Sequence, residues 1–183
     1  MRRGEELDLE AQARRRTAFA QIRQFGDPAL RLRARKVDRF DDDLRRLAER
    51  MTSLMADARG VGLAANQVGV VERLIVIQPN GDEGPRALVN PEIVELSPEV
   101  ETSEEGCLSL RGVLVPVERH LRVKAVAQDL DGAEVKLELE DLDARVLQHE
   151  IDHLDGVLIL DRTVPESRRE ALGVLRPRAS LRG

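Results

Sequence analysis

The chain has 183 residues, 42% hydrophobic and 34% charged, and a formal net charge of −5; this length fits one domain with terminal extensions. The negative charge argues against a protein whose whole surface binds nucleic acid, so no DNA partner is expected, and the single cysteine excludes an internal disulfide. No apolar run approaches the ~20 residues of a membrane helix and the N-terminus has no apolar signal region, so the sequence predicts a cytoplasmic protein without membrane contact.

The first third of the chain is predicted to hold two helices. Residues 5–25 carry weakly apolar positions among many charges, and the break at Gly26-Asp27-Pro28 is expected to end this first helix. Its arginine run, residues 14–16, is interpreted as a solvated face. Asp41-Asp42-Asp43 opens the second helix, because acidic residues are favourable at the N-terminal end of the helix dipole. Its apolar face consists of Leu44, Leu47, Met51, Leu54 and Met55.

The middle of the chain is predicted to form short strands. The glycine-rich run 60–67 ends the second helix, the β-branched stretch 74–77 is a strand, and Asn80-Gly81 is a turn. Further strands are expected at 87–89, 92–96 and 113–117. Residues 122–130 and 134–139 alternate apolar and polar side chains around Asp131-Gly132, which predicts a hairpin with a two-residue loop.

The last helix is expected from about Leu142 to Leu154, with Asp141 or a neighbour as N-cap and Gly156 as its end. This element order predicts an α+β domain with antiparallel β-sheets packed around a central helix that carries the HEIDH sequence. Residues 1–21 are expected to be a helical extension and residues 22–164 the main domain. Residues 165–183 form a short basic C-terminal tail that breaks at Pro177.

The sequence QHEIDH at residues 148–153 predicts a metal site. His149 and His153 are four residues apart and therefore lie on one helix face. Two imidazoles at this spacing can bind one metal ion, with Glu150 next to the first ligand; the alternative is a helix that carries two histidines by chance. Asp152 and Asp155 are candidates for carboxylates that hold imidazole N–H groups, or are exposed helix charges.

Two histidines leave the metal without a third protein ligand. After His153 there is no further histidine, and the only glutamates, Glu166 and Glu170, are close to the tail. The remaining soft ligand is Cys107, in the sequence EEGCLS. A thiolate and two imidazoles give a three-ligand site with an open position for water. Taken alone, a cysteine is more often a buried hydrophobic residue than a ligand.

Three stretches together resemble the signature motifs of the peptide deformylase family, in that family's order and spacing: GVGLAANQ at 60–67, EGCLS at 105–109 and QHEIDH at 148–153. The resemblance extends from about Ile22 to Thr163. It implies a bacterial hydrolase of protein biosynthesis that removes the formyl group from N-formylmethionine of nascent polypeptides and releases formate. It also implies one divalent metal ion, Fe2+ first, with Zn2+, Ni2+ or Co2+ able to take its place.

The resemblance also assigns the catalytic roles. The metal ligands would be Cys107, His149 and His153. A metal-bound water would attack the formyl carbon, with Glu150 as the acid/base. The oxyanion would be stabilised by two further donors, the side-chain amide of Gln67 and the backbone N–H of Leu108.

The same resemblance places the substrate peptide, as an added strand, along the backbone of Val61 and Gly62. The methionine pocket would be lined by Val61, Leu142 and Val146, although core packing explains these apolar residues equally well. Arg111 stands close to a position where many family members continue through a proline, which leaves the rim of the groove open to revision.

Two other functions are compatible with parts of the sequence. The two-histidine helix alone also fits a zincin-like metalloprotease, and an inactive relative could bind only metal or peptide. A monomer is expected. The basic residues of the C-terminal tail suggest a transient contact with ribosomal RNA, although a solvated tail explains them as well: they are Arg168, Arg169, Arg176, Arg178 and Arg182.

Overall fold

The computed structural model describes residues 3–80 and 84–176, with side chains from Leu9 onward. In this part of the chain the helices are α1 (Arg3–Gln21), α2 (Asp42–Asp57), α3 (Asp141–Leu154), α4 (Ile159–Arg162) and α5 (Pro165–Leu175), with 3-10 turns η1 (Pro28–Arg31) and η2 (Ala65–Val68). The strands are β1 (Gly62–Ala64), β2 (Leu74–Ile77), β3 (Arg86–Leu96), β4 (Val100–Gly106), β5 (Leu114–His120), β6 (Arg122–Gln128) and β7 (Glu134–Glu140).

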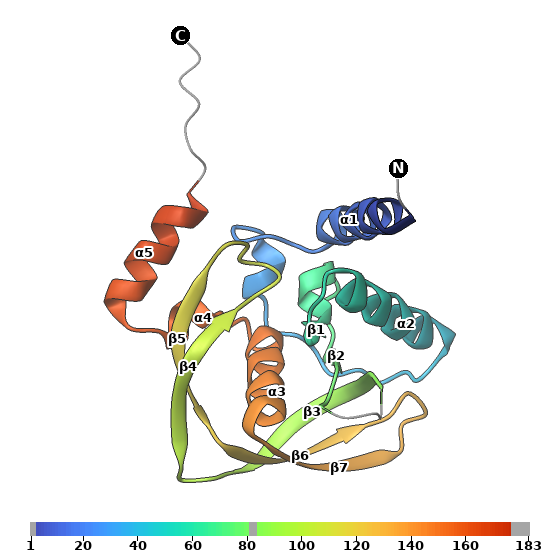
Figure 1. Cartoon of the computed structure of the whole chain (residues 1–183). Coiled ribbons are helices and arrows are strands. Elements are labelled where there is room, and N and C mark those ends of the chain that lie inside the picture. The colour runs from blue at the N-terminus through green and yellow to red at the C-terminus, as the bar shows by residue number, and fades with distance from the viewer. Residues whose placement is uncertain (1–2, 81–83, 177–183) are drawn as a thin grey trace.

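The strands form two antiparallel sheets around α3. One sheet has the order β1-β2-β3-β6-β7, and the other pairs β4 with β5. Helix α3 contacts strands of both sheets and stands at the centre of the molecule in Figure 1. The predicted α+β fold with a central helix is therefore confirmed, and the HEIDH sequence lies inside that helix.

Helix α2 forms where the sequence predicts it. The Asp41 carboxylate caps the helix by accepting hydrogen bonds from the backbone N–H groups of Asp43 and Leu44, at 3.1 and 3.2 Å. Of its predicted apolar face, Leu47 is partly buried and the other four residues are fully buried. This face packs against β1, which lies within the glycine-rich run, and against β2.

Helix α1 ends at Gln21, four residues before the predicted end. The reason lies in two backbone hydrogen bonds to distant segments. Arg23 N–H donates to the carbonyl of Gln67 at 2.7 Å, and Phe25 N–H donates to the carbonyl of Ser109 at 2.8 Å. These bonds replace helical ones and attach the segment after α1 to two of the signature motifs.

The sheets differ from the prediction in several details. The two strands expected at 87–89 and 92–96 are one strand, β3, with a register shift after Val89 and a positive φ of 51° at Asn90. Strand β4 was not predicted, because its residues are charged and mostly exposed. The β6–β7 hairpin is confirmed, but its loop has five residues: Asp129 accepts hydrogen bonds from the backbone N–H groups of Asp131 and Ala133, both at 2.9 Å.

The C-terminal segment is helical from Pro165 to Leu175, a structure that the sequence analysis did not predict. Pro165 occupies the start of α5, where its missing N–H costs nothing, and Ala171 is buried against β5 and α4. Helix α3 begins after Glu140 and ends before Gly156, whose φ is 74°. Gly81, Pro177, Arg178 and Arg182, named in the predictions above, lie outside the described residues. No helix in the described ranges has the length and apolarity needed to cross a membrane.

Candidate metal centre and active-site cavity

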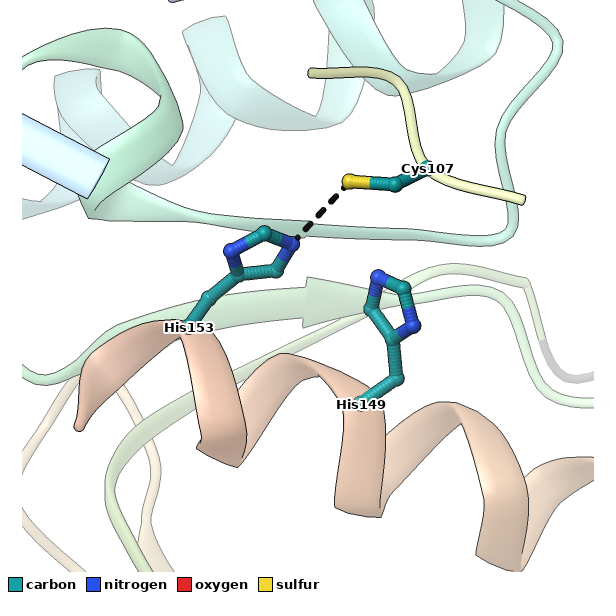
Figure 2. Close-up of side chains that lie close together, drawn as sticks. All are labelled: Cys107, His149 and His153. Atoms are coloured by element: carbon teal, nitrogen blue, oxygen red, sulfur yellow. Dashed lines mark hydrogen bonds between the residues drawn. The ribbon is translucent and has the colours of Figure 1, made fainter. Parts of the chain in front are cut away.

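Cys107, His149 and His153 converge at the surface of α3. Each offers one ligand atom, and the three atoms lie within 4.8 Å of one another. Figure 2 shows both imidazoles directed from the helix toward the sulfur atom, and the Cys107 Sγ to His153 Nε2 distance is 3.2 Å. Ligands bound to one ion at 2.0–2.3 Å in tetrahedral geometry are separated by roughly 3–4 Å. The donor set and its spacing therefore fit a single transition-metal ion.

A buried carboxylate orients the first histidine. His149 Nδ1 donates to Glu105 Oε2 at 3.0 Å, which leaves Nε2 of the ring for a metal. Arg119 forms a two-point contact with the same carboxylate, at 2.9 and 3.0 Å, and both side chains are 5% exposed. Burial raises the pKa of Glu105, but the hydrogen bonds from His149 and Arg119 outweigh it and lower that pKa to about 2. Glu105 is therefore ionised when it holds the imidazole.

Of the two alternatives for Asp152 and Asp155, the contact with an imidazole is wrong for both, and the exposed charge is correct for Asp155 alone. Asp152 binds Arg119 at 2.5 Å and Arg162 at 2.6 Å. Asp155 pairs with Arg73 at 2.8 Å on the surface. Neither aspartate holds an imidazole. The carboxylate with that position, Glu105, was overlooked, although it stands two residues before Cys107 in the EEGCLS sequence.

Glu150 is buried beside the ligands. Its side chain is on α3, is 4% exposed overall, and its Oε2 atom has no hydrogen-bond partner among the described residues. Burial raises the pKa of Glu150 to about 7, against the opposing effect of the His149 charge. A carboxyl group with a pKa near neutrality can both accept and donate a proton at physiological pH.

Gly62 leaves space for this carboxylate. A Cβ atom at position 62 would stand 2.3 Å from Glu150 Oε1 and 2.8 Å from its carboxyl carbon. No side chain fits there without moving Glu150. The glycine of the first signature motif is thus required by the close approach of β1 to α3.

Gln67 reaches the same site from η2. Its Oε1 accepts a hydrogen bond from Ala64 N–H at 2.9 Å, which fixes the amide. Its Nε2 then faces Ser109 Oγ at 3.0 Å and Cys107 Sγ at 3.6 Å. The Leu108 carbonyl is held by Gln24 Nε2 at 3.1 Å, so the loop after Cys107 is tied to the segment that follows α1.

One cavity of about 1370 Å³ contains most of the predicted site. The predicted residues that line it are Val61, Gly62, Gln67, Cys107, Leu108, Leu142, Val146, His149 and Glu150. His153 is 1% exposed and contacts Cys107 from behind this surface. Among the candidates for the methionine pocket, Val61 and Leu142 are each 47% exposed and Val146 is 8% exposed. The structure therefore brings together residues from three distant motifs.

Known proteins are similar to this chain in sequence and in fold. A family model described as polypeptide deformylase matches residues 19–169. A peptide deformylase of a Thermotoga species (strain RQ2) is 51% identical over 147 residues, which cover 80% of this chain and 88% of that protein. Peptide deformylase 1 of Corynebacterium glutamicum is 44% identical over 164 residues, covering 88% and 97%.

Solved structures of peptide deformylases resemble this fold. The crystal structure of peptide deformylase from Thermotoga maritima matches with a TM-score of 0.76 and 51% identity, and covers 79% of this chain and 97% of that one. A peptide deformylase from Synechococcus elongatus, solved in complex with actinonin, matches with a TM-score of 0.80 and 41% identity over 84% of each chain. The chain belongs to the polypeptide deformylase family, whose metal-dependent members remove the formyl group from nascent polypeptides.

Proposed function

We propose that this chain deformylates N-formylmethionyl peptides in the cavity at α3, with one divalent metal ion held by Cys107, His149 and His153. The convergence of these three side chains beside the buried Glu150 is the observation that carries the proposal. A bound divalent cation supplies Lewis acidity and lowers the pKa of a coordinated water. We infer Fe2+ as the ion in the cell, because of the family resemblance; the donor set suits Zn2+, Ni2+ and Co2+ as well.

Glu150 would act as the acid/base. Its Oε2 takes a proton from the attacking water and then delivers it to the amine nitrogen that leaves with the peptide. The products are formate and a free N-terminal methionine. Its burial and its pKa near 7 support this role, because the same group must accept a proton in one step and release it in the next.

Gln67 and the backbone N–H of Leu108 would stabilise the oxyanion on the former formyl oxygen. The fixed amide of Gln67 supports its part, since a donor that is already oriented needs no rearrangement during the reaction. Gln24 Nε2 donates to the Leu108 carbonyl, in the next peptide unit, and so holds the same residue from its other side. The tetrahedral carbon would lie between these donors and Glu150.

The peptide would bind as an added strand beside Val61 and Gly62. Both residues line the cavity; Gly62 begins β1, which is at the edge of its sheet, and Val61 immediately precedes this strand. The methionine side chain would enter the apolar side formed by Val61, Leu142 and Val146. The exposure of Val61 and Leu142 supports this, because core residues would be covered.

Formate release from a formyl-Met peptide tests the proposed function. The protein loaded with metal should release formate from the formylated peptide and leave the peptide bonds of formylated and unformylated versions intact. Glu150→Ala should reduce the rate by about 10²- to 10⁴-fold, whereas Glu95→Ala, an exposed site on β3, serves as the control. Endoproteolysis without formate release would contradict the proposal and favour the metalloprotease.

Residues 22–164 would form the catalytic domain of a cytoplasmic monomer, with residues 1–21 as an N-terminal extension. Residues 165–183 would keep the enzyme near ribosomal RNA, where its substrate emerges. The exposed arginines of α5, Arg168 and Arg169, support this contact. Unchanged co-sedimentation with ribosomes after removal of residues 166–183 would argue against it.

A further inference from the structure

Helix α1 forms one wall of the active-site cavity. Its residues Leu9, Gln12, Arg15, Arg16 and Phe19 line the same cavity as His149 and Glu150. The helix lies beside α2 in Figure 1 and contacts it. The family match begins at residue 19, so the wall residues Leu9, Gln12, Arg15 and Arg16 lie outside the match.

The C-terminal end of α1 is firmly attached to the core. Ala18 and Ile22 are 1% and 3% exposed and pack in the cluster that contains Met51 and Leu54 of α2. This attachment sets the position of the helical turn just before it, which carries Arg15 and Arg16. Wall residues at this end of α1 therefore have a defined place relative to the metal site.

Positive charge accumulates on this side of the cavity. The guanidinium groups of Arg15 and Arg111 both approach the ring of Phe19, at 5.6 and 4.6 Å from its centroid. Arg16 and Arg59 also line the cavity. Within the part of the chain that the structure describes, none of these four arginines forms an ion pair.

Neighbouring arginines behave differently. Arg14, on the same helix, pairs with Glu10 at 3.8 Å and with Asp57 at 4.0 Å, and does not line the cavity. Arg145 lines the cavity but is bound to Glu105 at 2.8 Å. Apart from the buried Glu105 and Glu150, the acidic residue that lines the cavity, among the residues described, is Glu104. On a protein with a net charge of −5, this group of unpaired arginines is a local reversal of charge.

We propose that Arg15 and Arg16 select substrate peptides by binding side-chain carboxylates that follow the formylmethionine. The inference rests on the proposed function, because the peptide has to occupy this cavity. A cavity of about 1370 Å³ exceeds the roughly 300–1,000 Å³ of a typical small-molecule pocket, which leaves room for residues beyond the methionine. An anionic side chain there relieves the mutual repulsion of the arginines.

The expected selectivity is modest. Ion pairs between partly exposed groups contribute a factor of roughly 1.5 to 5 each, so two arginines give about 2- to 25-fold. The effect should fall as salt is added, since a Debye length of about 10 Å at 0.1 M screens exposed charges. Both signatures appear in the ratio of kcat/KM values for charged and neutral peptides.

The test uses formyl-Met peptides that carry Asp, Ser or Lys at the second, third or fourth position. The metal-loaded full chain should prefer Asp over Ser and Ser over Lys at one or more positions, more strongly at low salt. Arg15→Gln combined with Arg16→Gln should abolish this preference, because kcat/KM for the Asp peptide should fall to the value for the Ser peptide in the same variant. Arg14→Gln should keep the preference, because Arg14 faces Glu10 and Asp57 instead of the cavity.

Other outcomes are equally decisive. The absence of a charge preference at all three positions would overturn the inference, as would a preference that survives in the double variant or is lost in Arg14→Gln. Ribosome binding that depends on Arg15 and Arg16, without any effect on peptide preference, would overturn it in favour of an RNA contact. No formate release from any peptide would instead refute the proposed function, so the two failures are distinguishable.

Discussion

Replacing Glu150 with glutamine tests how the ionisation of this buried side chain affects the free energy of unfolding. Burial raises the pKa of Glu150 from 4.5 to about 7, and each unit corresponds to ~1.4 kcal/mol. Between these two pH values, the folded metal-free protein should therefore keep a proton on Glu150 that the unfolded chain has already lost. As pH rises from about 4.5 to about 7, the free energy of unfolding of the wild type should fall by about 3 kcal/mol through this group.

Glu150→Gln lacks the ionisable group and should lack this decline. The amide leaves a buried N–H without a partner at the position of Oε2, at a cost of ~1–3 kcal/mol that is independent of pH. The diagnostic quantity is therefore the difference in the free energy of unfolding between variant and wild type, and how this difference changes with pH. The variant should be the less stable protein near pH 4.5 and should gain about 3 kcal/mol relative to the wild type by about pH 8.

Urea unfolding of the metal-free proteins, prepared with a chelator, measures this difference between pH 4.5 and 8. Glu49→Gln, at an exposed position on α2, controls for the change of carboxylate to amide. Parallel stability profiles for wild type and Glu150→Gln would refute the reasoning, because they would mean that the buried carboxyl titrates as it does in the unfolded chain.

Two further substitutions test the geometry around the proposed metal ligands. Gly62→Ala places a Cβ atom 2.3 Å from Glu150 Oε1, so kcat/KM for formate release should fall by about 100-fold. The metal content, measured by elemental analysis, should stay the same. Loss of the metal would contradict this, because it would mean that the close contact supports metal binding and not only the position of Glu150. Glu105→Gln removes the anionic partner of His149 Nδ1. Metal binding, measured by chelator competition, should weaken by about 10- to 100-fold. An unchanged metal affinity would mean that Glu105 only neutralises the charge of Arg119.

The C-terminal helix shows where pattern reasoning failed. Residues 165–175 carry charged side chains at 166, 168, 169 and 170 and are expected from the sequence to be a tail, yet they fold as α5 because Ala171 and its neighbours are covered by β5 and α4. Strand β4 was overlooked for the same reason. Its exposed, charged residues show no apolar alternation, and its position is fixed by hydrogen bonding to β5.

By itself, the sequence determined which residues are candidates for the site and the type of most elements. The four-residue spacing of His149 and His153 places both imidazoles on one helix face, which is a local property of any α-helix. The Asp41 cap and the apolar face of α2 are equally local.

Only the tertiary structure decided which distant groups complete the site. Glu105 and Arg119 orient His149, Gly62 admits Glu150, and α1 closes one side of the cavity. Each of these contacts joins residues that are far apart in the chain. Their partners depend on how the sheets pack around α3, and no local periodicity records that packing.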